Sequence, residues 1–361
     1  ANVVIGSGAG SAMTDNSSNV VIGKTAFDAA DSGENWNIAI GQDAGGAINH
    51  ADSDSNILIG VDAGTGGAAA MIGCIAIGKD SMNSTGTNAH TGTIAIGHDA
   101  LTALTSGAGN TAVGYSTLDS ITTGTYNTAV GYQAMHQVDQ AAVDSDHNTA
   151  IGYLSMGGAW ADAVSGYNVA VGGNTLAGVM DGANFNTAVG YAALATATSG
   201  DSNVAIGKDA LNVLTEGSNN TAIGSASGAS LTTGSMNVAI GKDAGDSLTS
   251  QDGCVLIGTD AGQLIHHDDA HYTVAIGYLA GRFIGQGAGN VCIGSQAMDV
   301  VGGTTADNNV AIGFDSMRSS GTSTDNTASN NVAVGHTALR YITTGTHNVA
   351  VGDNAARSLT T

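Results

Sequence analysis

The stretch Asn-Val-Ala-Ile-Gly-Lys-Asp-Ala at residues 203–210 contains the pattern that decides the fold. Its consensus, Asn-[Val/Thr/Ile]-Ala-[Ile/Val]-Gly-x-x-[Ala/Ser/Thr], recurs along the whole chain of 361 residues. The glycine of this motif occurs 20 times, at positions 6, 23, 41, 60, 78, 97, 114, 131, 152, 172, 190, 207, 224, 241, 258, 277, 294, 313, 335 and 352. Successive motif glycines are 17 to 22 residues apart, so a constant core alternates with variable spacers. This repeat predicts an all-β, parallel β-roll or β-solenoid of about 20 coils, with loops at the insertions.

Two faces of a short strand can be read from the motif. The residue before the glycine is Ile or Val in all 20 copies, and two places earlier stands Val, Ile or Thr. These columns share one face, because side chains alternate along a strand, and we expect that face to fill the coil. The residue between them is Ala in 15 of 20 copies. A strand that is apolar on both faces must be covered on both, so we predict that the alanine face meets another chain, at Ala112, Ala129, Ala205, Ala222 and Ala239.

The remaining motif positions predict a ladder between coils. Asn precedes the glycine by four residues in 16 of 20 copies, and a stacked amide can bond the turn backbone of the next coil. The glycine marks a bend with positive φ or a close backbone approach. We assign the ladder to Asn110, Asn127, Asn148, Asn203, Asn220 and Asn237, with Ile206, Ile223 and Ile240 on the strands and Gly207, Gly224 and Gly241 at the bends.

The four exceptions to the Asn column point to an internal duplication. They are Cys74, Thr93, Cys254 and Thr273, two Cys-then-Thr pairs that lie 180 residues, or ten coils, apart. We therefore expect one continuous solenoid over residues 1–361, built as a tandem duplication of ten coils.

Composition excludes several classes of protein. The chain has 55 glycines, no proline, 11% charged residues and a formal net charge of −22. Eight scattered basic residues do not form the basic patch that nucleic-acid binding needs. No apolar run approaches the roughly 18 residues of a membrane span. The three cysteines lie in apolar strand-like segments and are expected to be buried thiols.

The repeat resembles a known family. Residues 203–210 and Asn-Thr-Ala-Val-Gly-Tyr-Gln-Ala at residues 127–134 are similar to the head repeats of YadA-like trimeric autotransporter adhesins, and to similar repeats in phage tail fibres. The resemblance implies a left-handed parallel β-roll, a homotrimer around a shared axis, and a location outside the cell or on a virion. It also implies a surface that binds host glycans or matrix proteins. The coils here are longer than the family's head coils, through turn-like residues such as 231–235.

Motifs of catalysis are missing from the sequence, which contains no GxSxG, HExxH or Walker lysine motif, so we expect no enzyme and no cofactor. Aspartate stands two residues after the glycine in four successive coils, at Asp43, Asp62, Asp80 and Asp99. Stacked carboxylates repel one another, and a Ca²⁺ ion could relieve the repulsion; the alternative is that they splay into water beside lysines.

Other polar residues fall in insertions or on one column. Asp52, Asp54, Asp144, Asp146, His147 and residues 266–271 have donors that a transition metal could use, or form solvated loops. Tyr115, Tyr132 and Tyr153 follow the glycine in three successive coils. They are a candidate ligand surface for sugars, or they pack on one another.

Three functions remain open. The first is a non-catalytic structural or adhesive rod, the head or shaft of a surface adhesin or tail fibre that mediates attachment. The second is an extracellular filament subunit, because neither end shows a polar capping repeat and coils could stack from one subunit onto the next. The third is ice binding through the file Thr111, Thr128 and Thr149, which Val or Ile interrupts in most copies.

Overall fold

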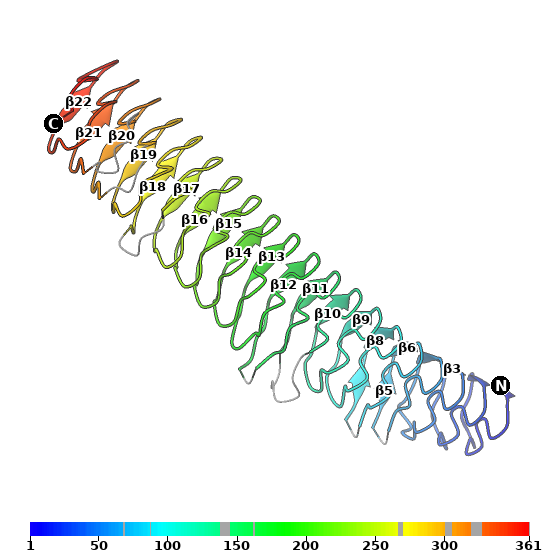
Figure 1. Ribbon diagram of the computed structural model, residues 1–361. Coiled ribbons are helices and arrows are strands. Elements are labelled where there is room, and N and C mark those ends of the chain that lie inside the picture. The colour runs from blue at the N-terminus through cyan, green and yellow to red at the C-terminus, as the bar shows by residue number, and fades with distance from the viewer. Residues whose placement is uncertain are drawn as a thin grey trace. The chain divides into compact units, whose positions relative to one another are not determined.

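The computed structural model describes residues 1–361 except 68, 87, 138–144, 162, 266–269, 300–304, 319–326 and 361. Within these limits the chain is all-β, without helices, and forms two compact units, Ala1–Phe185 and Asn186–Thr361. Each unit is a parallel β-solenoid in which every copy of the motif supplies one short strand (Figure 1). The predicted fold class is therefore confirmed at the level of an all-β parallel solenoid of about 20 coils.

Ten motif strands are described in each unit, and every one spans three residues. Unit 1 contains β1 (Val3–Ile5), β2 (Val20–Ile22), β3 (Ile38–Ile40), β4 (Ile57–Ile59), β6 (Ile75–Ile77), β8 (Ile94–Ile96), β9 (Thr111–Val113), β10 (Thr128–Val130), β11 (Thr149–Ile151) and β12 (Val169–Val171). It also has the shorter strands β5 (Met71–Ile72) and β7 (His90–Thr91), which pair with each other.

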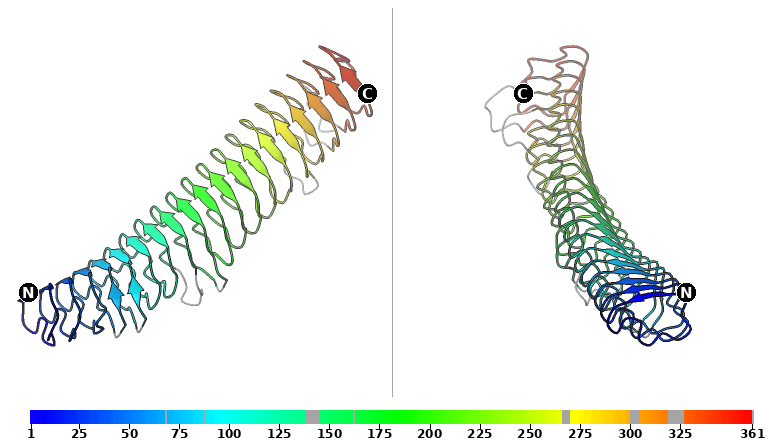
Figure 2. Two further views of the ribbon diagram at one scale, coloured as in Figure 1. Left: turned by 180° about the vertical axis from the view of Figure 1, so that it is seen from behind. Right: turned by 90° about the vertical axis from the view of Figure 1, so that its right-hand side faces the viewer.

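Unit 2 contains β13 (Thr187–Val189), β14 (Val204–Ile206), β15 (Thr221–Ile223), β16 (Val238–Ile240), β17 (Val255–Ile257), β18 (Val274–Ile276), β19 (Val291–Ile293), β20 (Val310–Ile312), β21 (Val332–Val334) and β22 (Val349–Val351). Within each unit, neighbouring motif strands pair in parallel with equivalent residues side by side (Figure 2). Ala205, for example, stands opposite Ala222. Every column of the repeat thus becomes a file of stacked side chains.

The structure reverses the predicted assignment of the two strand faces. Ala112, Ala129, Ala205, Ala222 and Ala239 lie inside the coil of their own chain, at most 3% exposed, so they cannot contact another chain. Ile206 and Ile223, expected inside, are 38% and 37% exposed. Large side chains from the bend, such as Leu211 and Leu214, fill the interior of the coil. The inward position of the strand therefore has room only for a side chain as small as alanine.

Two exceptions show how tightly the interior is filled. Leu58 and Leu256 replace alanine on the inward face, and in both coils the bend carries glycine four residues after the motif glycine, at a position that is Leu or Met in about half of the coils. A Cβ added at Gly64 would lie 2.4 Å from Leu58 Cδ2, and one at Gly262 would lie 2.6 Å from Leu256 Cδ2. Each leucine therefore fills interior space beside a bend glycine, where a larger bend residue would clash with it.

The asparagine column joins successive coils. The buried Asn220 side chain donates from Nδ2 to the Gly234 carbonyl at 2.8 Å and to Asn203 Oδ1 at 3.1 Å. Its Oδ1 accepts the backbone N–H of Asn237 at 3.0 Å. Asn127 and Asn148 accept and donate in the same way in unit 1. Each amide therefore satisfies buried backbone groups that no strand pairing reaches.

The two Cys-then-Thr pairs interrupt this ladder at corresponding coils of the two units. The hydroxyl oxygens of Thr93 and Thr273 are buried without a hydrogen-bond partner. The Sγ atoms of Cys74 and Cys254 lie 3.6 Å from the carbonyl oxygens of His90 and Ala270, and a thiol is a weak donor. Two successive coils in each unit thus lack the amide that the other coils use.

Two substitutions in this column are expected to change the free energy of unfolding in opposite directions. Asn220→Ala leaves the buried Asn237 N–H and Gly234 carbonyl without partners, and should lower the free energy of unfolding by about 3 kcal/mol. Thr273→Val removes a buried hydroxyl that has no partner, and should raise it by about 1 kcal/mol. Denaturant unfolding followed by circular dichroism measures both; equal effects would contradict the ladder.

Candidate functional site

The outward side of the motif strands is the most distinctive surface of each unit. We call it the outer sheet face, and define it as the side chains five, three and one residues before each motif glycine and one residue after it. In the coil of Gly131 these are Tyr126, Thr128, Val130 and Tyr132. The outer tyrosines are 58% and 48% exposed, and the two middle side chains are half-buried. Residues at alternate positions point the same way, which places all four on one side of the coil.

Charge is distributed unevenly between this face and the rest of the chain. Of the 30 acidic residues, Asp353 alone occupies an outer-sheet-face position. All four lysines of the sequence are on it, one residue after a motif glycine, at Lys24, Lys79, Lys208 and Lys242. The middle columns are Val, Ile or Thr throughout. A chain with a net charge of −22 therefore keeps the outer sheet face of each unit almost free of carboxylates.

Tyr115, Tyr132 and Tyr153 form a stacked file along one border of the outer sheet face. Ring centroids are 5.2 Å apart between Tyr115 and Tyr132 and 5.7 Å between Tyr132 and Tyr153, with interplanar angles of 11° and 19°. His98 extends the stack at 5.5 Å from Tyr115. Both faces of the Tyr132 ring are covered by its neighbours, so a sugar cannot stack on them. The geometry favours the packing alternative for this ring.

A second aromatic file borders the face on the opposite side, and the sequence analysis missed it. Tyr126, His147, Tyr167 and Phe185 stand five residues before the motif glycine in four successive coils. Their rings follow one another at 5.2, 4.9 and 5.2 Å. The signal was present in the sequence as an aromatic at one column in successive copies, but the spacers of variable length hid it.

The four aspartates of the acidic column share one backbone conformation. Asp43, Asp62, Asp80 and Asp99 all have φ between 54° and 58°, in the left-handed region that Asp tolerates better than most residues. Asp43 accepts a hydrogen bond from the Thr25 hydroxyl, and this bond lowers the pKa of the Asp43 carboxyl. The Lys79 ammonium donates to Asp80 and lowers the pKa of that carboxyl. Asp43 and Asp80 thus have hydrogen-bond partners within the chain.

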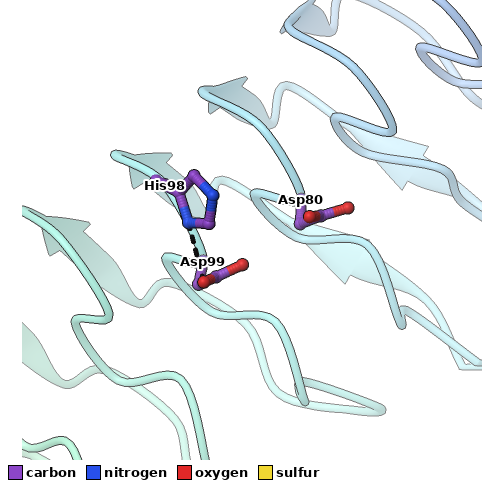
Figure 3. A group of neighbouring side chains, drawn as sticks. All are labelled: Asp80, His98 and Asp99. Carbon is purple, nitrogen blue, oxygen red and sulfur yellow. Dashed lines mark ion pairs between the residues drawn. The ribbon is translucent and has the colours of Figure 1, made fainter.

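Two aspartates of this column, Asp80 and Asp99, lie near a histidine, His98 (Figure 3). Asp80, His98 and Asp99 each offer a ligand atom, and these atoms lie within 4.8 Å of one another. His98 Nδ1 is 2.7 Å from Asp99 Oδ2. Among the described residues this is the one group of three or more His, Cys, Asp or Glu side chains with such spacing, and it includes neither Asp43 nor Asp62.

The polar residues of the insertions have structural partners where they are described. Asp54 and Asp146 accept the backbone N–H groups of Asn35 and Thr125 in the preceding coil. His271 Nδ1 accepts the N–H of Asp252 at 2.8 Å. Asp52 faces His50 at 3.9 Å. Asp144 and residues 266–269, proposed as metal ligands with them, lie outside the described residues.

The cysteines are buried, as expected. Burial raises the pKa of the Cys254 thiol to about 11 and that of Cys292 to about 12. Both therefore remain protonated at neutral pH, and a protonated thiol is a poor nucleophile and metal ligand.

Comparison with known proteins adds no family to this description. No protein-family model matches the chain, and no curated protein matches it in sequence. Within the described ranges, no helix has the length and apolar character that crossing a membrane requires.

Proposed function

We propose that the chain is a non-catalytic structural and adhesive component of a fibre, the head or shaft of a surface adhesin or phage tail fibre that mediates attachment outside the cell. Three copies associate through the outer sheet face, and each roll is left-handed. The observation that carries the proposal is this face, which is β-branched along each unit and almost free of carboxylates in a strongly acidic chain.

Electrostatics supports an interface at this position. Copies with a net charge of −22 repel one another, and the repulsion is weakest where no carboxylates face each other. Contiguous exposed apolar surface usually marks a contact with another protein, and interface cores are depleted in charge. The corrected strand orientation thus transfers the proposed trimer contact from the alanines to the Ile, Val and Thr columns. The repeat's similarity to trimeric adhesin heads supports three copies.

Attachment itself rests on the resemblance to adhesin and tail-fibre repeats. The surface left free in such a trimer is the loop-bearing side of each coil, and we propose it as the side that meets a host glycan or matrix protein. Binding surfaces of repeat proteins usually carry insertions of variable length, and this chain has such insertions between its motif copies.

Light scattering after size exclusion, with negative-stain images of the same peak, tests the assembly. A mass of three times 35.3 kDa that does not change with concentration is the expected result. A monomer at micromolar concentration would overturn the proposal. Particles that lengthen with concentration would favour the filament subunit.

Ice binding is retained as a second candidate on one observation. Thr111, Thr128 and Thr149 lie on the outer sheet face, half-buried and in parallel register. Thermal hysteresis of the purified chain would support this function, and its absence would remove it.

A further inference from the structure

We propose that Asp80, His98 and Asp99 bind one divalent transition-metal ion of the Zn²⁺ class, which connects two successive coils of unit 1. The proposal does not rest on attachment, and all three ligands come from one chain, with His98 at the border of the outer sheet face. In place of Ca²⁺ over four aspartates, one of the two alternatives for the acidic column, it has an imidazole and two carboxylates.

Strand register places the three donors together. Asp80 follows β6 and Asp99 follows β8, each two residues after a motif glycine, and these strands pair in parallel with equivalent residues opposite. Their backbones share φ values of 55° and 58°, so the two carboxylates project alike from adjacent bends (Figure 3). His98 precedes Asp99 and places its imidazole beside them, with all three ligand atoms within 4.8 Å.

The site is partly ordered before a metal arrives. The His98 ring stacks on Tyr115 with centroids 5.5 Å apart and an interplanar angle of 21°, which limits its rotation. The side chains of His98, Asp99 and Asp80 are 44%, 31% and 18% exposed, so an ion reaches them from solvent and keeps water in its remaining positions. Three protein ligands and a water complete a tetrahedral Zn²⁺ site.

The donor set selects the class of metal. Imidazole nitrogen suits Zn²⁺, Ni²⁺, Cu²⁺ and Co²⁺, whereas Ca²⁺ takes six to eight oxygen ligands, more than the two carboxylates of Asp80 and Asp99 supply. His98 Nδ1 and Asp99 Oδ2 already lie 2.7 Å apart, so little movement is needed for both to contact one ion. Lys79 donates to Asp80, but a carboxylate has about four lone pairs and retains capacity for a metal.

Unit 2 contains a matched arrangement without the imidazole. Lys242-Asp243 and Thr259-Asp260 stand at the same motif positions as Lys79-Asp80 and His98-Asp99, after the paired strands β16 and β17. Asp243 and Asp260 also share the left-handed φ, at 53° and 55°. Among the proposed metal ligands the two arrangements differ at one position, which is His98 in unit 1 and Thr259 in unit 2.

Calorimetric titration of the full chain with Zn²⁺ tests the proposal. The expected result is that His98→Thr weakens one site by roughly tenfold or more, while Thr259→His adds one equivalent of comparable affinity. Imidazole resonances in heteronuclear NMR should show the His98 ring shifting first as Zn²⁺ is added. Ca²⁺ should bind the wild type and His98→Thr alike. Unchanged Zn²⁺ affinity and stoichiometry in His98→Thr would overturn the proposal, and so would a His98 ring that does not respond.

Discussion

Replacing Gly224 by alanine is expected to cost unit 2 about 4 kcal/mol or more of its free energy of unfolding. An alanine Cβ at this bend would lie 2.4 Å from the carbonyl oxygen of Gly241 in the next coil, and that oxygen belongs to the backbone and cannot move aside. The φ of +139° adds strain, because L side chains rarely adopt it. Denaturant unfolding followed by circular dichroism should show the loss.

Gly352 provides a matched control in the same unit. It is a motif glycine with φ of +128°, but a Cβ added there would meet nothing within 4 Å. Gly352→Ala therefore carries the backbone strain without the clash, and should cost only about 1–3 kcal/mol. If the two substitutions had equal effects, close approach between coils would not be what requires the glycine.

The double substitution Ile206→Asp and Ile223→Asp is expected to separate the chains without unfolding them. Both side chains are more than a third exposed on the outer sheet face, so the coil can accept aspartate there. In the assembly the new carboxylates would face one another across an apolar contact, and like charges placed together cost several kcal/mol. The association constant should fall by roughly 100-fold or more. Light scattering should report a monomer whose circular dichroism equals that of the wild type.

Val213→Asp is the control for this pair. Val213 is 38% exposed, as is Ile206, and stands on the bend of the same coil, outside the outer sheet face. It should leave the mass unchanged. An assembly that survives the double substitution, or that dissociates equally with Val213→Asp, would place the contact elsewhere.

The repeat made most of the fold predictable. All 20 motif copies form strands, because each copy has β-branched residues at two alternate positions, on either side of a central residue that is usually alanine. The predicted orientation of those strands was wrong, because it was derived from the strand residues alone and did not consider the large bend side chains that fill the interior. Part of the correction was visible in the sequence: the two coils whose strand carries leucine in place of alanine, Leu58 and Leu256, carry glycine at the bend, at Gly64 and Gly262, next to that leucine.

The candidate site was less predictable. The aspartate column was visible, but spacing alone does not reveal that these residues have the left-handed φ. His98 was missed because it is a neighbour of Asp99 in sequence and of Asp80 only through the register of adjacent coils. The scarcity of carboxylates on the outer sheet face could be recognised only once the outward columns were known, because it depends on the positions of all carboxylates relative to the motif.

The breaks in the asparagine ladder have a mechanical consequence. A fibre that holds a particle to a surface carries load, and load opens the least stable contacts first. In unit 1 these are the coils of Cys74 and Thr93, and in unit 2 the coils of Cys254 and Thr273. These coils lack the hydrogen bonds of an asparagine side chain, and in each unit one buried threonine hydroxyl has no hydrogen-bond partner. Under tension each unit should therefore yield at its own defined coils and lengthen there, while the coils with a continuous ladder remain folded.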